Sequence, residues 1–102
     1  KRWILAGLAG KAAASVDEGA VSAMARGRSL LPAGVVSVKG PFDRGDSVNI
    51  VGPQGRTVAC GVANYGAVDL DRIKGCRSAE IAKILGFHFG DEVIHRNNMV
   101  ML

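Results

Sequence analysis

Hydrophobic and polar positions divide the chain into three stretches with different periods. In the first stretch, residues 14–16 predict a short strand, and Asp17 is a good N-cap for a helix that ends before Gly27. Four apolar residues of this helix share one face, since they are spaced by one, three and one positions: Ala20, Val21, Met24 and Ala25. The first stretch therefore predicts a strand followed by an amphipathic helix.

The second stretch has the short, valine-rich segments that are typical of β-strands bounded by Gly, Pro and Asp. These segments are residues 34–39, 46–51 and 56–65. The sequence GPQG at 52–55 suits a type I turn, which would join the last two segments as a hairpin. Val48 and Ile50 share one face of the middle strand, so we expect one face of the sheet to be buried.

The third stretch is mixed. Short helices are predicted at residues 69–74 and 78–85, and strands at residues 92–95 and 99–102. The second helix has Ser78 as its N-cap and an apolar stripe that faces the core. Helices and strands do not alternate strictly, which disfavours a doubly wound parallel sheet. The whole pattern predicts a mainly β fold with short α-helices, a pseudo-barrel of mostly antiparallel strands.

Composition limits the chain to one domain, because 102 residues is close to the usual size of a single domain. Residues 1–12 carry no turn or capping signal and are interpreted as a linker, which leaves residues 13–102 as the domain. Two cysteines without metal-ligand spacing and no secretory segment favour a reducing cytosol, and no apolar run reaches membrane-spanning length. The net charge of +4 allows a polyanionic partner without requiring one.

The sequence predicts no catalytic residue, no metal site and no cofactor for this chain. Residues 7–12 (GLAGKA) are too short for a phosphate-binding loop and lack its Ser or Thr. Cys60 and Cys76 are interpreted as structural, although basic neighbours leave a reactive Cys76 open. His88 and His95 lack a third ligand, and the acidic pairs are typical of caps and turns.

Basic residues form two groups in the sequence: Arg26 and Arg28 border the loop at 29–34, and Arg72, Lys74 and Arg77 follow a later β-like segment. If the fold brings the two groups together, they form one cationic face beside the loop. Together with loop backbone they would suit a phosphate chain, although an ordinary solvated surface is the alternative. Gly34 is expected at a tight junction between the loop and the next strand. The candidate phosphate-contacting residues are Arg26, Arg28, Ser29, Gly34, Arg72, Lys74 and Arg77.

Three motifs in this region look like those of the PUA domain, a small RNA-associated pseudo-barrel: VDEGA at 16–20, SLLPAGV at 29–35 and FDRGD at 42–46. Five further motifs resemble the C-terminal part of the bacterial glutamate 5-kinase family: KRWI at 1–4, NY at 64–65, RIKG at 72–75, ILG at 84–86 and HRN at 95–97. The resemblance covers essentially the whole chain.

This resemblance implies a parent enzyme of the cytoplasm that uses ATP and Mg²⁺ to phosphorylate the γ-carboxylate of L-glutamate for proline biosynthesis. No residue of that active site has a counterpart here, so the chain itself is not expected to be an enzyme. Its implied role is structural or regulatory, through contacts with its own kinase domain or neighbouring subunits. The alternative is an RNA-binding module, for which the family uses the elements matching residues 20–28, 29–34 and approximately 93–96.

Overall fold

The computed structural model describes residues 12–102, so the predicted linker lies outside the described residues except for Ala12. Its strands are β1 (Ala13–Val16), β2 (Val35–Lys39), β3 (Ser47–Val51), β4 (Thr57–Val62) and β5 (Met99–Met101). Its α-helices are α2 (Glu18–Ala25), α3 (Ala67–Ile73) and α4 (Ile81–Leu85). Three single 3₁₀ turns complete the described elements: η1 (Pro32–Gly34), η2 (Ser78–Glu80) and η3 (Arg96–Asn98).

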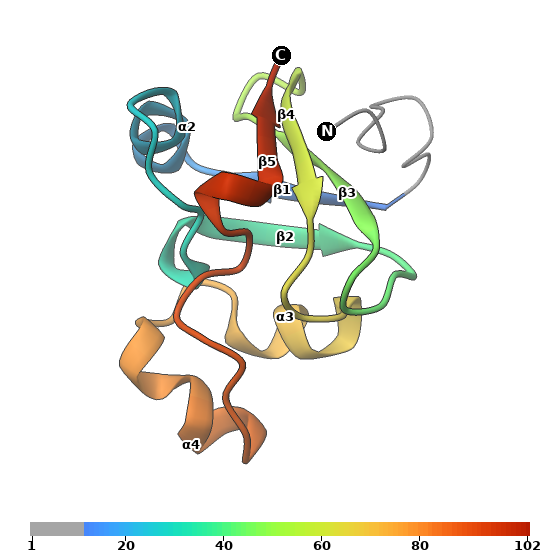
Figure 1. The fold of residues 1–102 in the computed structure, drawn as a ribbon, viewed down its shortest axis with the longest axis vertical. Coiled ribbons are helices and arrows are strands. Elements are labelled where there is room, and N and C mark those ends of the chain that lie inside the picture. The colour runs from blue at the N-terminus through green and yellow to red at the C-terminus, as the bar shows by residue number, and fades with distance from the viewer. Residues whose placement is uncertain (1–11) are drawn as a thin grey trace.

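The strands form one sheet in the order β2-β1-β3-β4-β5. Three of its four pairings are antiparallel, and β1 pairs with β3 in parallel. Strands β1 and β2 run across the view while β4 and β5 run along the long axis of the molecule, so the sheet curls (Figure 1). The mainly β fold with mostly antiparallel strands is confirmed.

The core lies inside this curl and extends beneath the helices. Val48 and Ile50 are buried as their spacing predicts, with 1% and 0% of their surface exposed. Helix α2 lies at one end of β1 and β2, while α3 and α4 lie below the sheet, away from the C-terminus (Figure 1). The largest fully buried side chains come from every part of the described chain: Tyr65, Met24, Leu30, Ile50, Leu70, Ile73, Ile81 and Ile94.

Several local signals act as the sequence predicts. The Asp17 side chain accepts a hydrogen bond from the Ala20 amide at 2.8 Å and so caps α2. The Gly55 amide donates to the Gly52 carbonyl at 3.0 Å, which closes the turn between β3 and β4. Gly86 follows α4 with a φ of 84°, a left-handed conformation that favours glycine.

Other expectations are wrong for tertiary reasons. Strand β4 ends at Val62 rather than at position 65, because the Asn64 amide donates to the Val93 carbonyl at 2.8 Å and not to the segment that precedes β3. Residues 92–95 do not form a strand; they make a single bridge between Ile94 and Leu30. Ser78 does not cap a helix, because its hydroxyl donates to the Asp91 carbonyl at 3.0 Å.

The other helical predictions need smaller corrections. Helix α3 begins two residues earlier than predicted, at Ala67, and ends at Ile73. On α2, three of the four predicted apolar residues face the core, but Ala25 is exposed. On α4, Ile81 and Leu85 are buried and Ile84 is half-buried, so that stripe is confirmed.

Candidate functional site

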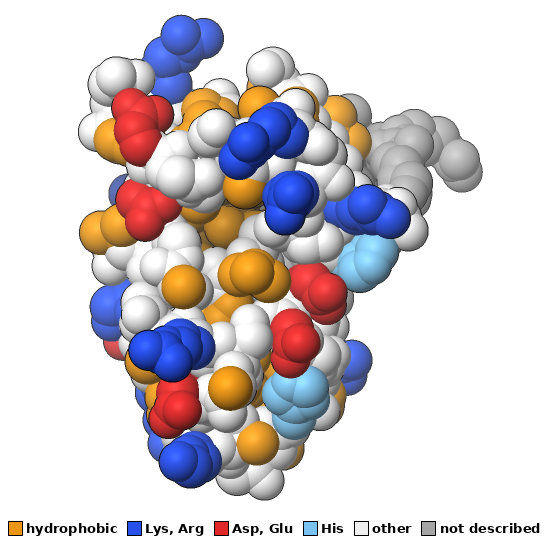
Figure 2. Space-filling model, turned by 90° about the vertical axis from the view of Figure 1, so that its left-hand side faces the viewer, with side chains coloured by type: hydrophobic (Ala, Val, Ile, Leu, Met, Phe, Trp, Pro, Cys, Tyr) orange, Lys and Arg blue, Asp and Glu red, His pale blue; other side chains and the backbone are white. Residues whose placement is uncertain are grey.

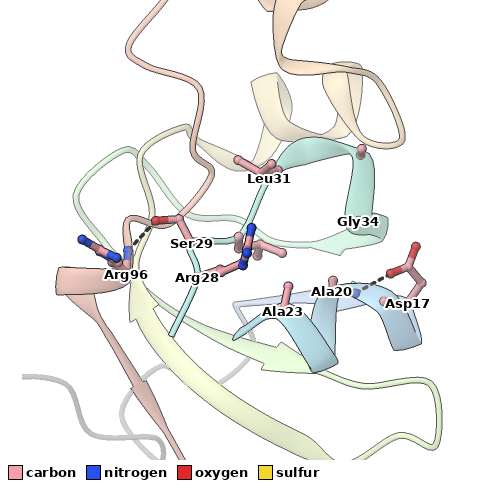
Figure 3. A pocket seen from close by; sticks show the side chains of 11 residues that line it. Asp17, Ala20, Ala23, Arg28, Ser29, Leu31, Gly34 and Arg96 are labelled. Carbon is pink, nitrogen blue, oxygen red and sulfur yellow. Dashed lines mark hydrogen bonds between the residues drawn. The ribbon is translucent and has the colours of Figure 1, made fainter. Parts of the chain in front are cut away.

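A groove with a volume of about 520 Å³ opens between α2, the loop through η1 and the start of η3. Apolar side chains and glycine backbone form most of its lining, and Asp17 and Arg96 lie towards its two ends with Arg28 between them (Figure 3). The lining residues that matter for the argument are Asp17, Ala20, Arg28, Ser29, Leu31, Gly34 and Arg96.

One end of the groove is closed by direct contact between η1 and α2. The Asp17 amide donates to the Gly34 carbonyl at 3.0 Å, and the Gly34 amide donates to the Leu31 carbonyl at 3.1 Å. A Cβ atom on Gly34 would lie 2.7 Å from the Cβ of Ala20. The backbone therefore approaches the helix more closely than any side chain at position 34 would allow, and this close approach is what makes the junction tight.

The other end is held by the chain that precedes β5. The Leu30 amide donates to the Ile94 carbonyl at 3.0 Å, and the Val93 amide donates to the Leu30 carbonyl at 2.7 Å. The Arg96 amide donates to the Ser29 hydroxyl at 2.8 Å. These bonds bring the segment near position 96 to the loop after α2, although the two are more than sixty positions apart in sequence.

Charge is distributed unevenly along the groove. Arg28 lies over its centre, the Arg96 guanidinium points outwards beyond Ser29, and Asp17 lies at the opposite end (Figure 3). Two ion pairs are found within residues 12–102, and neither of them involves Arg28 or Arg96. Basic side chains gather near the upper part of this face, above a hollow with hydrophobic side chains in it (Figure 2). The arginine end therefore suits an anionic group beside an apolar surface.

The structure brings three of the seven candidate residues together at the groove: Arg28, Ser29 and Gly34. Arg26 lies at the end of α2, where its amide donates to the Ser22 and Ala23 carbonyls, and its side chain does not line the groove. The other three basic residues lie at and after the end of α3. A backbone hydrogen bond from the Gly75 amide to the Pro32 carbonyl at 2.8 Å connects their segment to the loop.

Two of those three basic side chains bind their own surroundings. Arg72 donates to the Ile84 carbonyl in the last turn of α4. Lys74 forms an ion pair with Asp71 at 2.6 Å. Arg77 precedes η2 as its N-cap residue. These contacts give Arg72 and Lys74 a local structural role, while a role for all seven residues in RNA binding stays a prediction.

The cysteines and histidines occupy ordinary structural positions. Cys60 is 1% exposed, and burial raises the pKa of its thiol, which makes it a poor nucleophile. Cys76 is half-buried. His88 contacts Asp91 at 3.1 Å, and His95 Nδ1 accepts from the Asn97 amide at 3.1 Å. Within the described part of the chain, no group of three His, Cys, Asp or Glu residues could hold a metal ion.

The sequence patterns did not predict one cluster of aromatic side chains. Phe87 and Phe89 lie 5.0 Å apart between ring centroids, and Phe89 lies 5.6 Å from Tyr65. The Arg44 guanidinium lies 3.9 Å from the Phe89 ring centroid. The signal that was available is local: two phenylalanines two positions apart, between Gly86 and Gly90, predict a turn that exposes both rings.

A comparison with protein-family models matches residues 13–85 to the PUA domain. The chain belongs to the PUA domain family. It is 52% identical over 98% of its length to a glutamate 5-kinase of Herpetosiphon aurantiacus, and 50% identical over its full length to one of Shewanella woodyi. The match is to the C-terminal domain of these proteins, and the chain spans about a quarter of their length.

Solved structures agree with the family. A PUA domain protein of Aeropyrum pernix, solved as a tartrate complex, is 30% identical with a TM-score of 0.60, covering 83% of this chain and 41% of that one. The archaeal box H/ACA Nop10–Cbf5 complex contains a chain that is 28% identical with a TM-score of 0.58, covering 66% and 22%. None of the helices within residues 12–102 is long and apolar enough to cross a membrane.

Proposed function

We propose that this chain is the non-catalytic C-terminal domain of a glutamate 5-kinase and that it acts by contacting the rest of that enzyme. The observation that carries the proposal is the 52% identity over nearly the whole chain to a quarter of such an enzyme. The remaining three-quarters of that protein would supply the chemistry, namely transfer of phosphate from ATP with Mg²⁺ to the γ-carboxylate of L-glutamate in the cytoplasm.

Exposed apolar side chains support a contact role. Seven large hydrophobic residues are exposed among the described residues, including Phe87, Phe89 and Leu31. Exposed apolar surface beyond scattered single residues is typical of interfaces. We infer a structural or regulatory effect on the kinase, exerted by its own domain or by a neighbouring subunit.

The test compares the full-length protein with a version that ends before residue 13. We expect the shortened protein to retain ATP- and glutamate-dependent turnover while its thermal midpoint, its subunit assembly or its response to proline changes. A shortened protein that matches the full-length one in all of these properties would contradict a contact role. Loss of turnover in a shortened protein that remains folded would place part of the active site in this domain.

RNA binding at the groove is a second candidate, favoured by Arg28 and Arg96, which lie beside the Ser29 loop and form no ion pair within residues 12–102. Arginines and loop backbone would contact phosphates, with little aromatic surface there to stack bases. Binding should therefore be weak, salt-dependent and poor in sequence preference. Each single-strand phosphate contact contributes about 0.7 to the slope of log K against log salt.

Salt titrations with a single-stranded RNA test this candidate. Arg28→Ala and Arg96→Ala should each flatten the slope by about 0.7, whereas Arg72→Ala should leave it unchanged because that side chain is bound to the Ile84 carbonyl. An equal loss from all three substitutions would indicate diffuse surface charge. Tight binding that persists at high salt would show that the groove arginines are not its basis.

A further inference from the structure

Residues 87–92 form a loop whose backbone is held by the side chains of two residues that follow β4. The Tyr65 hydroxyl accepts from the Phe89 amide at 2.9 Å and donates to the Gly90 carbonyl at 2.6 Å. The Asn64 side chain donates to the Phe89 carbonyl at 2.8 Å and to the Glu92 carbonyl at 3.2 Å. Consecutive peptide groups of the loop are thus fixed before any partner arrives.

The loop uses this fixed backbone to expose aromatic rings. Phe87 and Phe89 keep 39% and 41% of their surface exposed, although Tyr65 directly beneath is fully buried. The Arg44 guanidinium lies over the Phe89 ring, 3.9 Å from its centroid, and forms no ion pair within residues 12–102. We call Phe87, Phe89 and Arg44 the aromatic surface.

Preorganised aromatic and arginine side chains are the residues that carry binding energy at protein interfaces. Ordering loops and side chains on binding normally makes the binding free energy less favourable. This effect is small here, because the hydrogen bonds of Tyr65 and Asn64 already fix the loop. The aromatic surface therefore has the properties of an anchor for another macromolecule.

The charge around the aromatic surface indicates which class of macromolecule would bind there. Asp43 and Asp46 flank Arg44 in sequence, the Asp46 carboxylate accepting from the Asp43 amide at 2.8 Å. Asp91 and Glu92 belong to the loop itself, and the Asp91 side chain is 63% exposed. His88 of the same loop contacts Asp91 at 3.1 Å, so four carboxylates stand against two basic side chains, Arg44 and His88. A protein surface with basic side chains therefore fits better than the phosphate chain of RNA.

We propose that the aromatic surface docks onto the kinase part of the same protein, at an apolar recess bordered by lysine or arginine side chains. This inference rests on the proposed function, because that function supplies the polypeptide to be contacted. The kinase part is the natural occupant because the chain spans only about 27% of the length of its relatives. The rings would fill the recess, and the four carboxylates would face its basic border.

Photo-cross-linking in the full-length protein tests the position of the contact. Phe87 is replaced by p-benzoylphenylalanine, which retains the aromatic ring, and Val36 is replaced in the same way as a control. Val36 is apolar and 59% exposed, and it lies on β2 outside the aromatic surface. We expect position 87 to cross-link to peptides of the kinase part and position 36 to give none of those cross-links.

Other products at position 87 would overturn the inference. Cross-links only to RNA, only to the same domain of another subunit, or to no other peptide would each show that the kinase part does not cover this surface. If removal of residues 13–102 still changes the enzyme in that case, the proposed function stands and only the assigned surface is wrong.

A pair of substitutions tests whether the contact stabilises the enzyme. Phe87→Glu should lower the thermal midpoint of the full-length protein by roughly 1–2 °C, because the shift for a given loss of free energy shrinks with protein size and this chain is only 27% of the length of its relative. Phe87→Leu should lower the thermal midpoint much less than Phe87→Glu, and Val36→Glu should leave it unchanged. Equal midpoints for Phe87→Glu and Val36→Glu would contradict docking at the aromatic surface.

Discussion

The groove and the aromatic surface are built by opposite means. The groove is shaped by backbone contacts between neighbouring elements, with Gly34 pressed against Ala20 and the Asp17 amide bound to the Gly34 carbonyl. The aromatic surface is held by side chains, since Tyr65 and Asn64 bind peptide groups 24 to 28 positions away. Small residues thus shape the groove, whereas larger polar side chains hold the loop that carries the aromatic surface.

This difference predicts how each region responds to substitution. At the groove, adding atoms should cause damage, because two backbones are already in contact. Beneath the aromatic surface, removing a single hydroxyl should cause damage, because it leaves polar groups without partners. The groove should therefore be sensitive to size, and the loop to hydrogen bonding.

The largest effect is expected from Tyr65→Phe. It removes one hydroxyl that serves as both acceptor and donor, so the Phe89 amide and the Gly90 carbonyl lose their partner, at a cost of about 2 kcal/mol. Urea denaturation measures the change. Ser78→Ala is the matched control, because it removes a less buried hydroxyl bonded to the same loop, and it should cost about 0.5 kcal/mol. Equal effects of the two substitutions would show that the Tyr65 contacts are not special.

Gly34→Ala should have the next largest effect, about 1.5 kcal/mol, since its Cβ would lie 2.7 Å from the Cβ of Ala20. The backbone of Gly34 has no positive φ, so steric overlap is the cause, not backbone strain. Ala20→Gly removes the opposing atom. The double variant should consequently be less destabilised than the sum of the two single variants, as a double-mutant cycle would measure. Simple additivity would contradict the close contact.

Arg72→Ala should have the smallest effect, roughly 0.5 kcal/mol, because it removes one exposed hydrogen bond to the last turn of α4. Arg72 belongs to neither the groove nor the aromatic surface. Amide exchange at residues 82–86 should rise in this variant. Exchange at the groove and at residues 87–92 should remain as in the unaltered protein, and a general rise would show that Arg72 stabilises the whole fold.

Sequence patterns predicted the parts of this fold that depend on neighbouring residues. The Asp17 cap, the turn at 52–55 and the left-handed Gly86 each need only a few consecutive positions, and all three are confirmed. The Ser78 hydroxyl illustrates the opposite case, because a partner thirteen positions away competes with the local cap. Hydrogen bonds to distant segments also decide that residues 92–95 form one bridge, to Leu30, and a bond to the Asn64 amide instead of a strand.

The candidate site follows the same division. Arg28, Ser29 and Gly34 are near one another in sequence and meet at the groove. Arg72 and Lys74 carry the same kind of charge, but their side chains bind the Ile84 carbonyl and Asp71. The sequence shows how many basic side chains there are, but not which of them are already bonded to neighbouring groups. The aromatic surface needed the fold most, because Arg44 and Phe89 are brought together by tertiary structure alone.

The place of β1 in the sheet determines how the domain resists mechanical force. Tension entering at Ala12 loads β1, which is hydrogen-bonded to β2 on one side and to β3 on the other, so two sets of pairings must yield together. Tension at the C-terminus meets β5, an edge strand with three paired residues and one neighbour. An unfolding machine that pulls from the C-terminus should therefore peel the domain strand by strand. A pull from the other end is instead borne by the middle of the sheet.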